Sequence, residues 1–86
     1  MAKYSIRIKK TARKELESIG TKPDRQKIIK RILSLADNPF PVGSMKLSGR
    51  DRYRLRQGNY RILYAVEDRV LVVQVIKIGH RKNVCR

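Results

Sequence analysis

The sequence is poor in cysteine and has no long hydrophobic run. Its single cysteine, Cys85, excludes a disulfide framework within the chain and any zinc cluster built on cysteines. The longest apolar run, from Val70 to Val73, is the length of a strand and too short to span a bilayer. The first ten residues contain charges but no apolar core, so they do not resemble a signal peptide. We therefore expect a cytoplasmic protein that does not enter a membrane.

Acidic residues are also scarce. There are 7 of them against 22 lysines and arginines, which gives the 86-residue chain a formal net charge of +15, and none lies after Asp68. Such a charge on a small folded domain indicates an anionic partner, with nucleic acid as the first candidate. A solvated, solubilising surface is the alternative, although solubility needs a smaller and better mixed charge. A membrane surface fits less well, because no strongly amphipathic basic helix with exposed aromatic residues is evident.

Sequence motifs for nucleotide binding and metal catalysis are missing. No P-loop, dinucleotide-binding glycine pattern, HExxH motif or Cys/His zinc spacing occurs. The carboxylates are scattered over the predicted helices and turns, whereas a two-metal nuclease needs a cluster of them. We therefore expect neither a cofactor nor a metal. An enzyme built from these residues would attack a phosphodiester without a metal, and RNA suits this chemistry best because its own 2′-OH can be the nucleophile.

The residue pattern predicts one α+β domain over residues 1–86, in two layers and in the order β-α-α-β-β-β. Alternation predicts a strand at 4–8. Helical periodicity predicts a helix from an N-cap at Thr11 to Ile19, and a second helix that has Pro23 in its first turn and ends before Pro39. An extended piece is expected at 45–47, a hairpin at 52–57 and 59–66, and a last strand at about 69–78. The two helices should cover one face of an antiparallel sheet, and the place of the first strand in that sheet stays open.

A turn at Gly58-Asn59 places three arginines on one face of this hairpin. With a two-residue turn, Arg56 faces Arg61 and Arg54 faces Leu63. Like charges directly opposite each other destabilise a sheet, by about 3 kcal/mol at roughly 5 Å and an effective dielectric of 20, before screening. An anion would relieve this repulsion, whereas solvated arginines that spread apart are the alternative. Strict alternation also puts Ile78 on the arginine face and brings the end of the last strand, with His80 and Arg81, beside the cluster.

Each of the other candidate residues has an ordinary structural alternative. His80, the only histidine, is an acid or base, or else a structural or phosphate-contacting residue. Cys85 is a reactive thiol near cations, or else an incidental residue of the tail. Three cations of the second helix either form its solvated face or contact a nucleic-acid backbone: Lys27, Lys30 and Arg31. The remaining candidate RNA contacts are Lys46, Lys77, Lys82 and Arg86.

The segments KLSGRDRYRLRQGNYRILY and VLVVQVIKIGHRKNVCR resemble the RelE branch of the RelE/ParE toxin superfamily. The resemblance covers nearly the whole chain and rests on the KL-x-G, YRLR-x-G-x-YR-x-x-Y and GHR motifs. It implies the toxin of a type II toxin–antitoxin system, which enters the ribosomal A site and cleaves mRNA there. The implied reaction is a metal-free attack by the 2′-OH that leaves a 2′,3′-cyclic phosphate and a 5′-OH. It also implies an antitoxin partner, encoded adjacently, that wraps the toxin.

The same resemblance implies roles for individual residues. Arg54 and Arg56 match residues that bind and polarise the scissile phosphate. Arg61 matches an arginine that stabilises the transition-state charge, and Arg81 matches a further active-site arginine. At Cys85 the family often has a tyrosine that stacks on the base, so this chain lacks the stacking ring and has a thiol instead. Two alternatives are a ParE-like inhibitor of DNA gyrase, whose relatives generally lack this arginine set, and a non-catalytic basic nucleic-acid-binding module.

Overall fold

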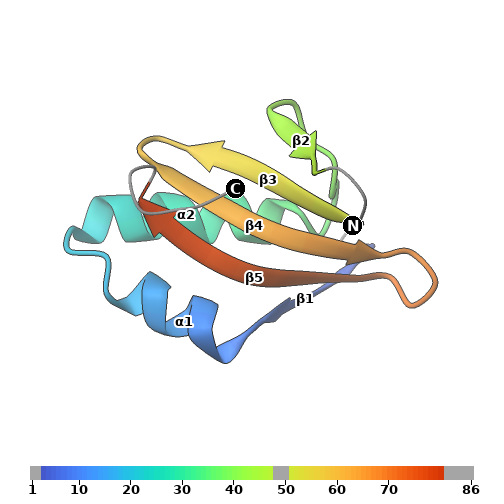
Figure 1. The fold of residues 1–86 in the computed structure, drawn as a ribbon, viewed down its shortest axis with the longest axis horizontal. Helices are drawn as coiled ribbons and strands as arrows, with labels where there is room; N and C mark the ends of the chain where they lie inside the picture. The colour runs from blue at the N-terminus through green and yellow to red at the C-terminus, as the bar shows by residue number, and fades with distance from the viewer. Residues whose placement is uncertain (1–2, 48–50, 81–86) are drawn as a thin grey trace.

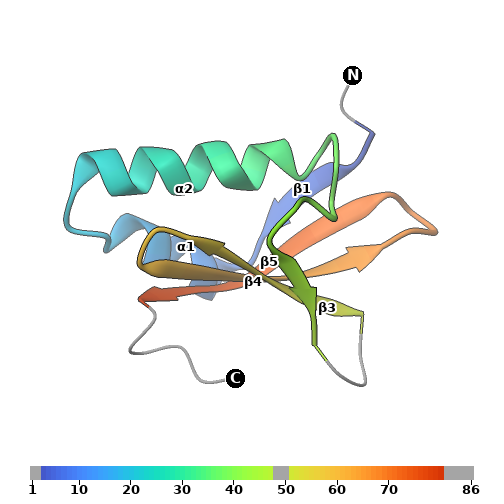
Figure 2. The same ribbon diagram turned by 90° about the horizontal axis from the view of Figure 1, so that it is seen from above.

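The computed structural model describes residues 3–47 and 51–80. These residues form two helices and five strands (Figure 1): β1 (Ser5–Ile8), α1 (Lys10–Glu17), α2 (Lys22–Ser34), β2 (Ser44–Lys46), β3 (Arg52–Gln57), β4 (Tyr60–Glu67) and β5 (Val72–His80). The strands make one sheet in the order β1-β5-β4-β3-β2. Figure 2 shows both helices on the same side of this sheet. In the described part of the chain, the other face is covered by no helix or strand.

The predicted α+β class, with a helix layer on one face of a sheet, is confirmed. The sheet is mixed rather than antiparallel throughout, because β1 pairs with β5 in parallel at one edge. The extended piece expected at 45–47 forms a strand, β2, which pairs antiparallel with β3. Four described strands therefore follow the helices instead of three. The other neighbouring pairs, β3 with β4 and β4 with β5, are antiparallel as expected.

The helix boundaries agree with the periodicity to within a turn. The predicted N-cap of the first helix was wrong: Lys9 caps α1, without a side-chain hydrogen bond, and Thr11 lies inside the first turn. α1 ends at Glu17, yet Ile19 is still buried in the core at 6% exposure. Pro23 lies in the first turn of α2 as predicted, because the N–H that proline lacks has no helical acceptor at that position.

The hydrophobic core lies between the helix layer and the sheet. α2 contributes Ile28 and Ile32, which are one turn apart, and β4 contributes every second residue from Ile62 to Val66. The largest side chains that are almost completely buried are Ile28, Ile32, Leu35, Leu55, Ile62, Tyr64, Val73, Val75 and Ile78. Ile78 belongs to this core although strict alternation placed it on the arginine face.

A β-bulge in β5 explains why Ile78 is buried. The pairing between β4 and β5 runs Leu63 with Lys77 and then Tyr64 with Val75. Ile76 is thus an extra residue, and beyond it the side chains of β5 point to the opposite faces. Ile78 lies opposite Ile62 in the core at 2% exposure. The prediction that Ile78 shares the arginine face was wrong, because alternation holds only where no extra residue interrupts the strand.

Aromatic residues join the loop after α2 to the sheet. The hydroxyl of Tyr64, whose side chain is fully buried, donates a hydrogen bond to the carbonyl oxygen of Pro39 at 2.7 Å. The Tyr64 ring stacks on Tyr53 with centroids 5.7 Å apart, and Tyr53 meets Phe40 edge to face at 5.1 Å. Tyr64 therefore both fills the core and satisfies a carbonyl of the loop.

The ionisation of Tyr64 predicts how stability depends on alkaline pH. Burial raises the pKa of Tyr64 above its ordinary value, and the hydroxyl of Ser44 partly offsets this effect. The folded protein then holds the phenolic proton more tightly than the unfolded chain. This contribution is fully present below about pH 10, the unfolded value, and is lost as the pH rises through the folded pKa. Urea denaturation on either side of that pH should show a steeper fall in unfolding free energy for the wild type than for Tyr64→Phe. Parallel pH profiles would contradict the argument.

Candidate functional site

Strands β3 and β4 bring three arginines together on the open face of the sheet. Arg56 lies opposite Arg61, and Arg54 lies opposite Leu63, which confirms the predicted hairpin register. Gly58 has a φ of 59°, the left-handed conformation that a tight hairpin turn requires and that glycine adopts without strain. The conformation of the turn therefore places Arg56 and Arg61 directly opposite each other on the two strands.

The three arginines differ in how exposed their side chains are. Arg54 and Arg61 are half-buried and Arg56 is exposed. The Arg54 Nη2 atom donates to the Sδ atom of Met45 on β2 at 3.3 Å, a weak bond that leaves the positive charge uncompensated. Arginine keeps its charge at neutral pH and presents a planar set of donors. The cluster is thus suited to a phosphate group or another oxyanion.

Two further arginines share this open face and were not singled out from the sequence. Arg52 lies opposite Ala65, in phase with Arg54 on β3. Arg7 of β1 lies opposite Gln74, which is itself the partner of Ala65. The alternation of side chains along β3 was enough to predict that Arg52 lies on the same face as Arg54. Arg7 could not be found in that way, because its place depends on the parallel pairing of β1 with β5.

Lys77 was predicted to contact RNA, and the structure places its ammonium group against α1. Its Nζ atom forms an ion pair with Oε2 of Glu15 at 2.9 Å. The other carboxylate oxygen of Glu15 accepts the backbone N–H of Ile78, also at 2.9 Å. The pairing of β1 with β5 ends at Ile8 and Val75. Beyond the end of β1, Glu15 therefore supplies the hydrogen-bond acceptor for the free edge of β5 and anchors this edge to α1.

This anchoring predicts a stability effect at Glu15. The substitution Glu15→Ala should lower the unfolding free energy by about 1.5 kcal/mol, because hydrogen bonds to charged groups contribute that much when partly buried. Hydrogen exchange of the Ile78 amide should also become faster. Glu17→Ala is the matched control, since Glu17 is an exposed carboxylate on the same helix. If the two substitutions had the same effect on stability and exchange, Glu15 would not anchor the strand.

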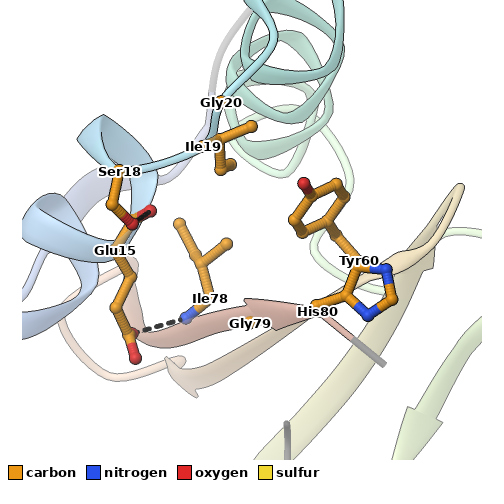
Figure 3. Close-up of a pocket in the computed structure, with 8 residues that line it drawn as sticks. All are labelled: Glu15, Ser18, Ile19, Gly20, Tyr60, Ile78, Gly79 and His80. Atoms are coloured by element: carbon orange, nitrogen blue, oxygen red, sulfur yellow. Dashed lines mark hydrogen bonds between the residues drawn. The ribbon is translucent and has the colours of Figure 1, made fainter. Parts of the chain in front are cut away.

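The structure places the side chain of His80 on the helix side of the sheet. Gly79 lies opposite Arg61, so β5 does end beside the arginines, but His80 lies opposite Tyr60. The two rings meet edge to face with centroids 5.5 Å apart. Both contribute to a pocket of about 300 Å³ near the end of α1 (Figure 3), lined by Glu15, Ser18, Ile19, Gly20, Tyr60, Ile78, Gly79 and His80. None of the three clustered arginines lines this pocket.

The remaining candidate residues are dispersed. Lys46 is exposed on β2 and lies opposite Tyr53. It is the neighbour of Met45, which pairs with Arg54, so its side chain leaves the opposite face of the sheet. The three predicted cations of the second helix all lie on α2, in the helix layer. Four candidates lie outside the described residues: Arg81, Lys82, Cys85 and Arg86.

Neither a cluster of metal ligands nor a membrane-spanning helix occurs among the described residues. Within residues 3–47 and 51–80, no group of three or more His, Cys, Asp or Glu side chains is positioned to hold a metal ion. In the same ranges, neither helix has the length and apolar character needed to cross a membrane.

Known proteins that share this sequence pattern identify the family. The family model for the ParE toxin of the type II toxin–antitoxin system parDE matches residues 6–84. The chain belongs to the RelE/ParE superfamily of type II toxins. This RelE-like toxin is 31% identical over 84 residues to a putative RelE-like toxin protein of Escherichia coli, a match that covers 94% of this chain and 86% of that protein.

Solved structures of RelE toxins have the same fold as this RelE-like toxin. The archaeal RelE–RelB complex from Pyrococcus horikoshii matches with a TM-score of 0.80 at 26% identity, over 95% of this chain and 99% of the matched chain. The intact RelBE toxin–antitoxin complex of Escherichia coli matches with a TM-score of 0.75 at 30% identity, over 96% and 99% of the two chains. The similarity therefore extends over the full lengths of these toxins.

Proposed function

We propose that this toxin is a ribosome-dependent endoribonuclease that cuts mRNA in the A site without a metal. The observation that supports it is the convergence of Arg54, Arg56 and Arg61 on the open face of the sheet. Guanidinium groups bind phosphate oxygens in a bidentate manner and neutralise charge that develops on them. Two opposed cations that repel each other in the free protein would be stabilised by a phosphate between them.

In the proposed reaction, each arginine stabilises charge and none transfers the proton. The 2′-oxygen bonds to the adjacent phosphorus while the bond from phosphorus to the 5′-oxygen breaks. Arg54 and Arg56 hold the scissile phosphate, and Arg61 stabilises the charge on its oxygens in the transition state. The 2′-OH proton passes to a base and the 5′-oxygen gains a proton. The products are a 2′,3′-cyclic phosphate and a 5′-OH.

The proton acceptor must come from another group, because arginine stays protonated at neutral pH. Cys85, as a thiolate, is the candidate within this chain at the position where the family often has a tyrosine. We assign Arg81, which directly follows β5, a further contact to the phosphate. The role of Arg81 and the position of Cys85 come from the family resemblance, whereas the thiolate as a base is inferred from the chemistry of cysteine.

An antitoxin is the second partner of the proposal. The matched toxin structures from Pyrococcus horikoshii and Escherichia coli are complexes of RelE with RelB. An adjacently encoded antitoxin with an acidic wrapping segment would complement the net charge of +15 on this chain. We place the site of action in the cytoplasm, where ribosomes translate mRNA.

The test is a cleavage assay on ribosomes stalled with a defined codon in an empty A site. Primer extension maps the cut, and the chemistry of the new 3′ end identifies the cyclic phosphate. We expect one cut within the A-site codon and none in the same mRNA without ribosomes. The absence of a cut by a protein shown to be folded would reject the proposal for this chain. Cys85→Tyr would then show whether the tyrosine of its relatives restores cutting.

A second candidate function is inhibition of DNA gyrase, which the match to the ParE family model favours. A supercoiling assay with purified gyrase separates the two functions, because a gyrase inhibitor would block supercoiling and leave programmed ribosomes intact. A non-catalytic nucleic-acid-binding module would do neither and would only bind RNA or DNA. The arginine cluster favours the nuclease, since ParE-like toxins generally lack that set.

A further inference from the structure

A shallow groove between α2 and the end of β3 collects three cations. Lys27, Lys30 and Arg31 line it together with Ser34 and, from β3, Gln57, and its volume is about 420 Å³. The spacing of the four α2 residues puts them on one face of the helix. The groove is therefore a cationic surface made by two elements that are distant in the sequence.

Neither lysine of this groove takes part in an ion pair with a described residue. Like charges three and four residues apart on a helix repel each other. No acidic residue lines the groove. The only acid of α2, Asp24, accepts a hydrogen bond from the hydroxyl of Thr21 at 2.7 Å. Across residues 3–47 and 51–80, neither Lys27 nor Lys30 has an ion-pair or hydrogen-bond partner.

Arg31 is a more rigid part of the same groove. Its side chain is half-buried, and its Nη2 atom donates to the carbonyl oxygen of Val42 at 3.3 Å. Its Nε atom is buried and has no acceptor among the described residues. Arg31 therefore adds a positive charge of fixed orientation to the groove, while its buried Nε atom is not a donor that a ligand in the groove can reach.

We propose that this groove binds the phosphate backbone of RNA, at a site separate from the arginine face. Gln57 and Arg56 are consecutive on β3, so their side chains leave opposite faces of the sheet. The groove lies in the helix layer and the arginines lie on the open side, so one phosphate cannot occupy both sites.

The composition of the groove favours RNA over a protein ligand. Three cations and no acidic residue line it, so a ligand there must carry negative charge at a regular spacing, as backbone phosphates do. Phosphates of a duplex backbone need only cations and polar donors. The proposal deepens the proposed function and rests on it, because ribosomal RNA is the duplex-rich RNA that a ribosome-bound toxin would meet.

The experiment compares two double variants that remove the same charge. Lys27→Gln/Lys30→Gln alters the groove, and Lys10→Gln/Lys14→Gln alters exposed cations of α1. Binding to a fluorescein-labelled 20-base-pair RNA duplex and to vacant ribosomes is measured over a range of salt concentrations. The groove variant should bind about tenfold or more weakly, and its slope of log K against log salt should fall by about 2, since each lost phosphate contact removes about 0.9. The α1 variant should change much less in both measurements.

Two results would overturn the groove as an RNA site. Equal losses in both double variants would mean that only net charge matters. Unchanged RNA binding with lost binding to polyglutamate would assign the groove to an acidic protein partner. The measurement with the RNA duplex tests the groove independently of the nuclease. Weaker duplex binding by the groove variant alone, together with no A-site cutting by the wild type, would reject only the nuclease. A-site cutting by the wild type, together with equal losses of duplex binding in both double variants, would reject only the groove.

Discussion

Arg61→Ala should lower the rate of A-site mRNA cleavage by about 10²–10³-fold, the usual effect of removing one donor that stabilises transition-state charge. Arg61 lies opposite Arg56 on the open face of the sheet, where a phosphate between them would contact both guanidinium groups. The loss should appear in single-turnover cleavage on programmed ribosomes at saturating protein. Because the substitution removes one of two opposed cations, the melting temperature should stay the same or rise slightly.

Arg69→Ala is the matched control for this variant. Arg69 is an exposed arginine in the turn after β4, whereas Arg61 lies near the start of that strand, so the two are at opposite ends of the sheet. Its removal lowers the net charge equally and should leave the cleavage rate close to that of the wild type. Undiminished cutting by Arg61→Ala would remove Arg61 from the chemistry. A clear fall in its melting temperature would show that Arg61 stabilises the fold despite the facing cation.

Tyr64→Ala should have the largest effect on stability, with a loss of about 3–5 kcal/mol in the free energy of unfolding. The ring is fully buried on the central strand β4 and stacks on Tyr53. Domains of this size have only about 5–15 kcal/mol of stability in total. The melting temperature should therefore fall by about 15 °C or more, as measured by calorimetry or circular dichroism.

Tyr64→Phe separates the contribution of the ring from that of the hydroxyl. It keeps the packing but removes the hydrogen bond to the carbonyl oxygen of Pro39, so we expect a loss of about 1–2 kcal/mol. Cleavage by the folded fraction should be unaffected, because Tyr64 faces the helices. Equal losses in the two variants would mean that the hydroxyl, rather than ring packing, dominates at this position.

The features that sequence alone determined are those set by neighbouring residues. The Gly58-Asn59 turn defines the hairpin register, and the register places Arg56 opposite Arg61. The periodicity of α2 predicts its buried residues, Ile28 and Ile32, because a helix repeats every 3.6 residues. Three of the five arginines placed on the open face, and the two-layer α+β class, therefore follow from local patterns.

Other features were decided only when distant segments met in the tertiary structure. Apolar residues occupy both faces of the last strand apart from Gln74, Lys77 and His80, so strict alternation does not identify Ile76 as an extra residue. The bulge there turns His80 toward Tyr60 and the helix side. The parallel pairing of β1 with β5 brings Arg7 onto the open face, and Glu15 reaches the free edge of β5 from α1. The placements of Arg7 and Glu15 depend on contacts between residues more than sixty positions apart. Local preferences do not specify which of several distant segments a residue will contact.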